Sequence, residues 1–264
     1  MKKSLVLLLI SSLVSGLYAR QPRTVVEPPF AFRNSGTLEI ERIELAPEST
    51  TVYIQAYFRP HNWIRISSET YIRTGAEGEK LTVRSADGMP LDTEFYMPET
   101  GRHDFSLSFP PVDPKTAKID LIESDCPDCF KIYDIDLTGK KAKPGRSALA
   151  KKYKKAAPLT ENFTAPVVSD SPARIAGAIT GYDPRFFDRI EIAFYSPIVG
   201  DGATELSVPV REDGSFETGL NILTPIRGML FLPGFVTLPF YAEPGRETAL
   251  EIDLGAVYRK TSVF

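Results

Sequence analysis

Short runs of alternating apolar and polar residues, separated by glycine and proline turns, are the feature that most limits what this chain can fold into. In His103–Phe109, the side chains of Phe105, Leu107 and Phe109 fall on one face of an extended chain. This two-residue period predicts a half-buried strand. The 264-residue chain has 22 prolines and 18 glycines, enough to supply turns between many short strands.

The first half of the chain contains a series of such runs. Strands are expected at 37–45, 51–58, 63–66, 70–72, 80–84, 103–109, 118–123 and 130–137. The proline-rich stretch 20–36 is expected to be irregular. No segment of useful length has a helical period, so several strands joined by tight turns predict an antiparallel β-sandwich.

A second series of alternating runs begins at residue 173. Strands are expected at 173–182, 189–195, 205–210, 216–220, 228–232, 236–241 and 248–254. A glycine-containing turn at 211–215 predicts a hairpin between two of them. The predicted fold is therefore all-β, with two tandem antiparallel sandwiches of the immunoglobulin or transthyretin type.

The segment 140–171 separates the two series and differs from both. It begins with a run of lysines and arginines and continues as a stretch rich in proline, serine and threonine. Such charge runs are usually solvated, so the segment is interpreted as a linker between domains at 20–139 and 172–264. The alternative is a basic patch that binds an anionic surface.

Residues 1–19 have the pattern of an export signal. Lys2 and Lys3 precede an apolar run that is too short to span a bilayer, which needs roughly 20 residues. The mature chain is therefore expected in the periplasm or outer cell envelope, without a transmembrane segment. The formal net charge of −3 argues against nucleic acid as a partner.

The only two cysteines, Cys126 and Cys129, have the C-x-x-C spacing and fall between two expected strands. Catalytic dithiols of this spacing place the first sulfur at a helix N-terminus. Here the apolar positions after Cys129 have a two-residue period and then shift phase before Ile135, which predicts a strand with a bulge. Neighbouring carboxylates would raise the thiol pKa. The pair is interpreted as a structural disulfide in a turn, with thiol-disulfide chemistry as the alternative.

No metal, cofactor or catalytic residue is predicted. His61 and His103 would complete a four-ligand zinc site with the cysteines, but they are 42 residues apart on different expected strands. The chain has no glycine-rich nucleotide loop, no H-E-x-x-H and no G-x-S-x-G motif.

The single tryptophan, Trp63, has aromatic neighbours in the sequence. These rings are interpreted as packing in the core of the sandwich. The alternative is that Trp63 forms a platform with Tyr57 and Tyr71 for a glycan such as peptidoglycan.

Several segments resemble a known family. W-I-R-I-S-S-E-T-Y-I at 63–72, F-S-L-S-F-P-P at 105–111 and I-D-L-I-E-S-D-C-P-D-C-F-K-I-Y at 119–133 resemble the N-terminal region of exported TlpA-like thiol-disulfide oxidoreductases. G-A-I-T-G-Y at 177–182 and P-G-R-E-T-A-L-E-I-D-L at 244–254 resemble the β-sandwich domain that follows in those proteins.

The resemblance extends over about residues 28–254 and implies a non-catalytic role. In that family, the catalytic C-x-x-C lies in a thioredoxin-like domain after the sandwiches, and Cys126 and Cys129 match the non-catalytic part. We therefore expect an exported accessory module, not an enzyme, that binds an envelope protein or a glycan. The alternatives are a thiol-disulfide oxidoreductase using these two cysteines and a carbohydrate-binding module.

Overall fold

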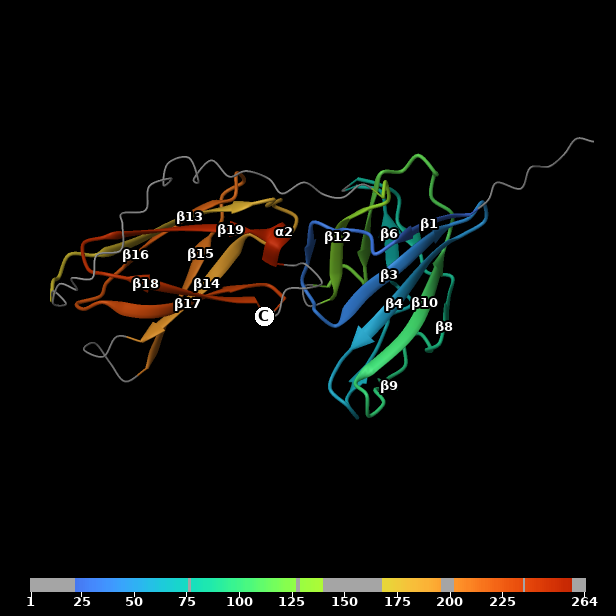
Figure 1. Ribbon diagram of the computed structural model, residues 1–264, viewed down its shortest axis with the longest axis horizontal. Coiled ribbons are helices and arrows are strands. Elements are labelled where there is room, and N and C mark those ends of the chain that lie inside the picture. The colour runs from blue at the N-terminus through green and yellow to red at the C-terminus, as the bar shows by residue number, and fades with distance from the viewer. Residues whose placement is uncertain are drawn as a thin grey trace, which may run out of the picture.

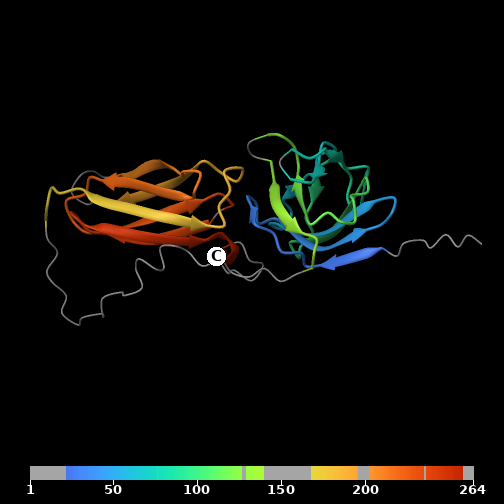
Figure 2. The same ribbon diagram turned by 90° about the horizontal axis from the view of Figure 1, so that it is seen from above.

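The computed structural model describes residues 22–75, 77–126, 129–139, 168–195, 202–234 and 236–257. Within them, two β-sandwiches follow one another along the long axis of the molecule (Figure 1), and Figure 2 shows the pair from above. The expected all-β sandwich fold is confirmed. The expected signal at 1–19 lies outside the described residues, as do residues 140–167 of the expected linker.

Two five-stranded sheets form the first sandwich. One has the order β1-β3-β4-β10-β8, with strands at Arg23–Val26, Leu38–Leu45, Thr50–Tyr57, Arg102–Phe109 and Ser85–Asp87. The other has the order β2-β12-β11-β6-β7, with strands at Phe32–Arg33, Lys131–Asp136, Lys118–Ile122, Tyr71–Arg73 and Leu81–Thr82. All neighbouring strands in these two sheets run antiparallel.

The core of the first sandwich comes from the inward residues of both sheets. As the alternation predicts, Phe105, Leu107 and Phe109 of β10 are buried, and Leu107 lies opposite Val52 of β4. Other fully buried side chains of this core include Ile43, Ile54, Ile72, Ile119, Leu121 and Ile135.

The proline-rich segment 20–36 contains two strands, so the expectation that it is irregular is wrong. β1 extends one sheet, with Val25 opposite Ile43, and β2 extends the other, with Phe32 opposite Tyr133. Runs of four and two residues are too short to show a period. Pairing with a distant neighbour creates these strands, and the local pattern does not reveal it.

The phase shift expected before Ile135 corresponds to an irregularity between β11 and β12. The register shifts between Ile119 and Leu121. Asp134 has a positive φ of 54°, a conformation that Asp tolerates better than most residues. Its backbone N–H donates to Oδ1 of Asp120 at 2.9 Å. The buried carboxylate therefore accepts a hydrogen bond from a backbone N–H at the point where the strand ladder is interrupted.

A separate two-stranded sheet pairs β5 (Trp63–Ile64) with β9 (Phe95–Tyr96). It lies at the lower end of the first sandwich in Figure 1, where β9 is labelled. The residues of β9 were not expected to form a strand.

The second sandwich combines a three-stranded and a four-stranded sheet. The first has the order β16-β13-β19, at Ser215–Leu220, Ala173–Thr180 and Glu247–Asp253, and the second β15-β14-β17-β18, at Ala203–Pro209, Arg189–Tyr195, Ile226–Leu232 and Val236–Ala242. A single turn of helix, α2 (Leu254–Val257), follows β19. Two expectations about pairing are wrong. The last strand, β19, lies beside the first, β13, in the same direction, and the strands on either side of the turn at 211–215, β15 and β16, belong to different sheets and form no hairpin.

An aromatic cluster joins the two sandwiches. Phe186, in the connection between β13 and β14, stacks on Phe32 of β2 with ring centroids 4.8 Å apart. Its ring also lies 5.4 Å from that of Tyr133 in β12. All three are buried and belong to the same hydrophobic cluster as Ile192 and Leu230 of the second sandwich. In Figure 1, β12 lies on the side of the first sandwich that faces the second.

Ion pairs extend this junction around Arg185. Its Nη1 lies 3.3 Å from Oδ2 of Asp120, and its Nη2 lies 3.3 Å from Oδ1 of Asp134. Within the second sandwich its Nε lies 3.0 Å from Oδ1 of Asp183. Hydrogen bonding to Asp183, followed by Asp134, raises the pKa of Arg185. The guanidinium therefore stays charged and links carboxylates of both sandwiches.

Candidate functional sites: a disulfide turn and an exposed aromatic face

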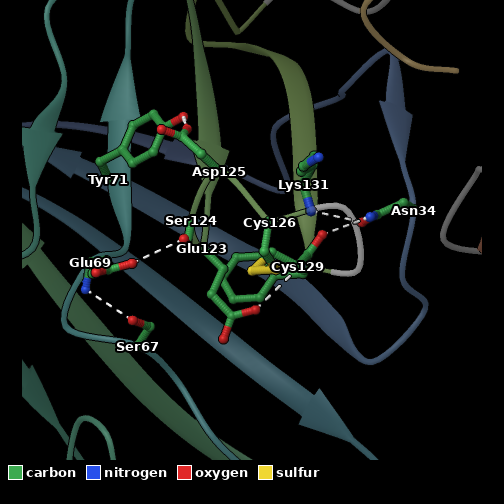
Figure 3. The surroundings of a disulfide bond; sticks show 11 residues. Asn34, Ser67, Glu69, Tyr71, Glu123, Ser124, Asp125, Cys126, Cys129 and Lys131 are labelled. Atoms are coloured by element: carbon green, nitrogen blue, oxygen red, sulfur yellow. Dashed lines mark hydrogen bonds between the residues drawn. A yellow bond between two sulfur atoms is a disulfide. The ribbon is translucent and has the colours of Figure 1, made fainter.

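Cys126 and Cys129 form a disulfide in the turn between β11 and β12 (Figure 3). Cys126 is exposed, whereas Cys129 is only 9% exposed. The chain after Cys129 continues into Lys131–Asp136 as a strand. Among the described residues around the pair no helix begins, so neither sulfur receives from them the helix-dipole stabilisation that activates catalytic dithiols.

Hydrogen bonds close the same turn independently of the disulfide. The backbone N–H of Glu123 donates to the carbonyl of Phe130 at 3.0 Å, and the N–H of Phe130 donates to Oε2 of Glu123 at 3.3 Å. The side chain of Asn34 donates to the carbonyl of Cys129 at 2.8 Å and accepts from the N–H of Lys131 at 2.7 Å. These contacts hold both ends of the turn in place.

A second group of contacts fixes the other side of the turn, on the left in Figure 3. Asp125 accepts hydrogen bonds from the Tyr71 hydroxyl at 2.9 Å and from the Lys80 ammonium at 2.5 Å. The same ammonium lies 4.7 Å from the centre of the Tyr71 ring. The hydroxyl of Ser124 donates to Oε2 of Glu69 at 3.0 Å.

The electrostatics of the turn follow from burial and from these partners. Burial raises the pKa of the Glu123 carboxyl. Burial, followed by the hydrogen bond to Asp125, raises the pKa of Tyr71 to about 12, so its hydroxyl remains a donor at neutral pH. Hydrogen bonding to Lys80 and then Tyr71 lowers the pKa of Asp125, which keeps this carboxylate charged beside the cysteines.

A second candidate site lies on the β5–β9 sheet. Trp63 and Tyr96 are directly opposite each other and are 47% and 61% exposed. Directly opposed residues project from the same face of a sheet, with Cβ atoms roughly 5 Å apart. Two exposed charged residues adjoin these strands, Arg65 directly after β5 and Glu94 directly before β9, and the Tyr96 hydroxyl donates to Oε2 of Glu94 at 3.0 Å.

The structure agrees with the expected core packing for Tyr71 but not for Trp63, and it does not form the alternative platform of Trp63, Tyr57 and Tyr71. Tyr71 is only 4% exposed and hydrogen-bonds Asp125 beside the disulfide, so it is not part of a platform with Trp63. Tyr57 is 42% exposed but ends β4, in a different sheet, and its hydroxyl donates to Gln55.

The true neighbour of Trp63, Tyr96, is 33 residues away in the sequence. A strand at Tyr96 could have been predicted from the alternation in Glu94-Phe95-Tyr96-Met97, where Phe95 and Met97 turn inward. A four-residue alternation is weak evidence for a strand, and the pairing register adds the decisive information.

The two histidines lie in different environments. Nε2 of His103 hydrogen-bonds the carbonyl of Gly88 at 2.8 Å, and its ring stacks on Phe95 with centroids 4.0 Å apart. His61 has a positive φ of 61° in the loop before β5. In the part of the chain that the structure describes, no three His, Cys, Asp or Glu side chains are grouped to hold a metal ion. Nor does any helix in that part have the length and apolar character needed to span a bilayer.

Comparisons with known proteins add little to this description. No protein-family model matches the chain, and no curated protein matches it. The type I pullulanase of Bacillus subtilis, solved with maltose, aligns over 73% of this chain and 23% of its own, at 9% identity and a TM-score of 0.27. The pullulanase SAP of GBS, solved with maltotetraose, aligns over 70% and 21%, at 11% identity and a TM-score of 0.23.

The Bacillus anthracis TIE protein aligns over 88% of this chain and 40% of its own, at 8% identity and a TM-score of 0.23. This chain spans about a quarter of the length of the pullulanases. Similarities at these TM-scores carry no argument about function. The resemblance to TlpA-like proteins stays a prediction.

Proposed function

We propose that this protein is a non-catalytic, exported binding module and that the face formed by Trp63, Arg65, Glu94 and Tyr96 binds glycans. We refer to these four residues as the β5–β9 face. The observation that carries the proposal is the exposure of Trp63 and Tyr96 directly opposite each other in paired strands. Exposing two large aromatic side chains together is unfavourable in water and often marks a binding surface.

The composition of the β5–β9 face supports a sugar as its ligand. A pyranose ring presents apolar C–H groups on its faces and hydroxyls around its edge. The rings of Trp63 and Tyr96 offer flat apolar surface, while Glu94 accepts and Arg65 donates hydrogen bonds. One positive and one negative side chain give this face no net charge, which favours a neutral glycan over a strongly anionic one.

Binding measurements with the full mature chain test this proposal. We expect binding on a glycan array, followed by titration calorimetry with the best soluble oligosaccharide, and a loss of about tenfold in affinity for Trp63→Ala and for Tyr96→Ala, which is about 1.4 kcal/mol each. Tyr241→Ala is the matched control, because Tyr241 is 55% exposed on the second sandwich. Absence of binding to every glycan, or undiminished binding by the double variant, would contradict the proposal.

The disulfide turn supports the non-catalytic part of the proposal. Its cysteines lie between two strands with charged or buried carboxyl groups around them, and this environment disfavours a thiolate. We expect no turnover in an insulin-reduction assay. Turnover by the wild type that is lost in Cys126→Ser would show a thiol-disulfide oxidoreductase instead.

A further inference from the structure

The disulfide differs from a buried structural staple in two respects. The first is its asymmetric exposure, because Cys126 faces solvent while Cys129 is 9% exposed. A thiolate from another molecule can therefore reach the Cys126 sulfur more readily than the Cys129 sulfur. Exposed disulfides tend to be the labile ones, whereas buried structural disulfides resist reduction.

The second respect is that hydrogen bonds hold the same turn in addition to the disulfide. The turn is closed by two hydrogen bonds between Glu123 and Phe130, and Asn34 holds the backbone on both sides of Phe130. None of these contacts involves a sulfur atom. A disulfide that spans so short a loop also removes little entropy from the unfolded chain. Breaking the sulfur–sulfur bond should therefore leave the backbone at Glu123 and at 129–131 in place.

From these two features we infer that the Cys126–Cys129 disulfide is a site of reversible thiol-disulfide exchange with a dithiol protein, in which the Cys126 sulfur is attacked. This inference is independent of the proposed glycan face. The protein would then be the substrate of a dithiol oxidoreductase, and it would need no activated thiolate of its own.

The exchange balances in two steps. A thiolate of the partner attacks Sγ of Cys126, the Cys126–Cys129 bond breaks, and the Cys129 sulfur leaves as a thiolate that takes a proton from solvent. The second thiol of the partner then attacks the mixed disulfide and releases Cys126. The products are two thiols on this chain and a disulfide on the partner.

The surroundings of the turn restrict which partner fits. The charged carboxylate of Asp125, which pairs with Lys80, lies beside Cys126. On the same side of the turn, the carboxylate of Glu69 accepts a hydrogen bond from Ser124. An approaching dithiol surface with basic or neutral residues around its attacking sulfur avoids like-charge repulsion.

Two matched variants test which of the two sulfurs a second molecule can reach. Cys129→Ser leaves only the exposed thiol, and Cys126→Ser leaves only the buried one. With glutathione disulfide as the probe and intact mass as the readout, we expect Cys129→Ser to form the mixed disulfide at least about ten times faster than Cys126→Ser under native conditions. Equal rates, or faster reaction of Cys126→Ser, would overturn the inference.

The wild-type chain provides the second test and requires no substitution. Dithiothreitol in native buffer, followed by alkylation and mass measurement, should reduce the disulfide while circular dichroism still shows the folded β signal. Reoxidation with glutathione disulfide should restore the starting mass. A disulfide that stays oxidised until denaturant is added, or a reduced chain that unfolds, would mean that the bond is a structural staple.

Discussion

The carboxylate of Asp120, fully buried in the first sandwich, accepts a hydrogen bond from Arg185 of the second, with 3.3 Å between Oδ2 and Nη1. The same oxygen lies 3.2 Å from Nε of Arg73, and Oδ1 accepts the backbone N–H of Asp134 at 2.9 Å. Asp120 therefore connects its own sheet, the irregular segment of β12 and the neighbouring sandwich. The two sandwiches are held by this ionic contact and by the aromatic cluster beside it.

Removing the Asp120 side chain should be strongly destabilising. In Asp120→Ala, Arg73 and Arg185 lose a shared anion and the N–H of Asp134 loses its acceptor, so we expect a loss of about 3 kcal/mol in the free energy of unfolding. Urea denaturation measures this loss. Asp104→Ala is the control, because Asp104 is exposed on β10 and should cost less than about 1 kcal/mol. Similar small losses for both variants would contradict the role given to Asp120.

Phe186 should contribute as much as a core residue, although it lies in a connection between strands. Its ring is buried between Phe32 and Tyr133, so Phe186→Ala is expected to cost about 3 kcal/mol. Phe231→Ala, at a 39% exposed position of β17, should cost clearly less. Thermal denaturation of the two variants gives the comparison, and equal losses would argue against a packed junction.

The raised pKa of the Glu123 carboxyl predicts that the free energy of unfolding depends on pH. Burial raises its pKa in the folded state, so its favourable contribution is complete below the ordinary glutamate pKa and is lost as the pH rises through the raised value. Glu123→Gln removes this loss and keeps an acceptor for Phe130. We expect the variant to match the wild type in acid and to be more stable at neutral pH. A stability difference that is constant with pH, or that favours the wild type at neutral pH, would contradict this assignment.

Gly228 makes room for an aromatic ring in the second sandwich. A Cβ placed on Gly228 would lie 2.2 Å from the tip of the Phe240 ring, on the strand directly opposite. Gly228→Ala should therefore cost about 1–3 kcal/mol through overpacking. Gly219→Ala is the control, because its added Cβ would meet only the carbonyl of Ala173 at 4.0 Å. Chemical denaturation that gives equal midpoints for the two variants would contradict this packing.

The paired substitution Cys126→Ser/Cys129→Ser should lower stability only slightly. The loop between the cysteines is so short that the chain-entropy contribution of the disulfide is at most about 2 kcal/mol, and the hydrogen bonds of the turn remain. Differential scanning calorimetry of the oxidised wild type and the variant measures the loss. A loss well above that limit would give the disulfide a larger structural role than its loop length implies.

The positions of the longer strands could be predicted from the sequence because each of them has its own alternation of apolar and polar residues. The runs around Phe105 and Ile192 showed which side chains face the core, and the phase shift before Ile135 indicated the irregularity in β12. Strands without a period were missed, and these include β1, β2 and β9. The alternative platform grouped Tyr71 with Trp63 because the two are close in sequence, whereas strand pairing places them in different sheets.

Local patterns in the chain were enough to predict the all-β class, the positions of most strands and the location of the cysteine pair between two of them, because these depend on neighbours a few residues apart. The pairing of Tyr96 with Trp63 and the contact of Arg185 with Asp120, 65 positions earlier, became visible only in the folded molecule. Such contacts depend on strand register and on how two sheets pack. Those are set by the sum of many distant interactions, and no local pattern records them.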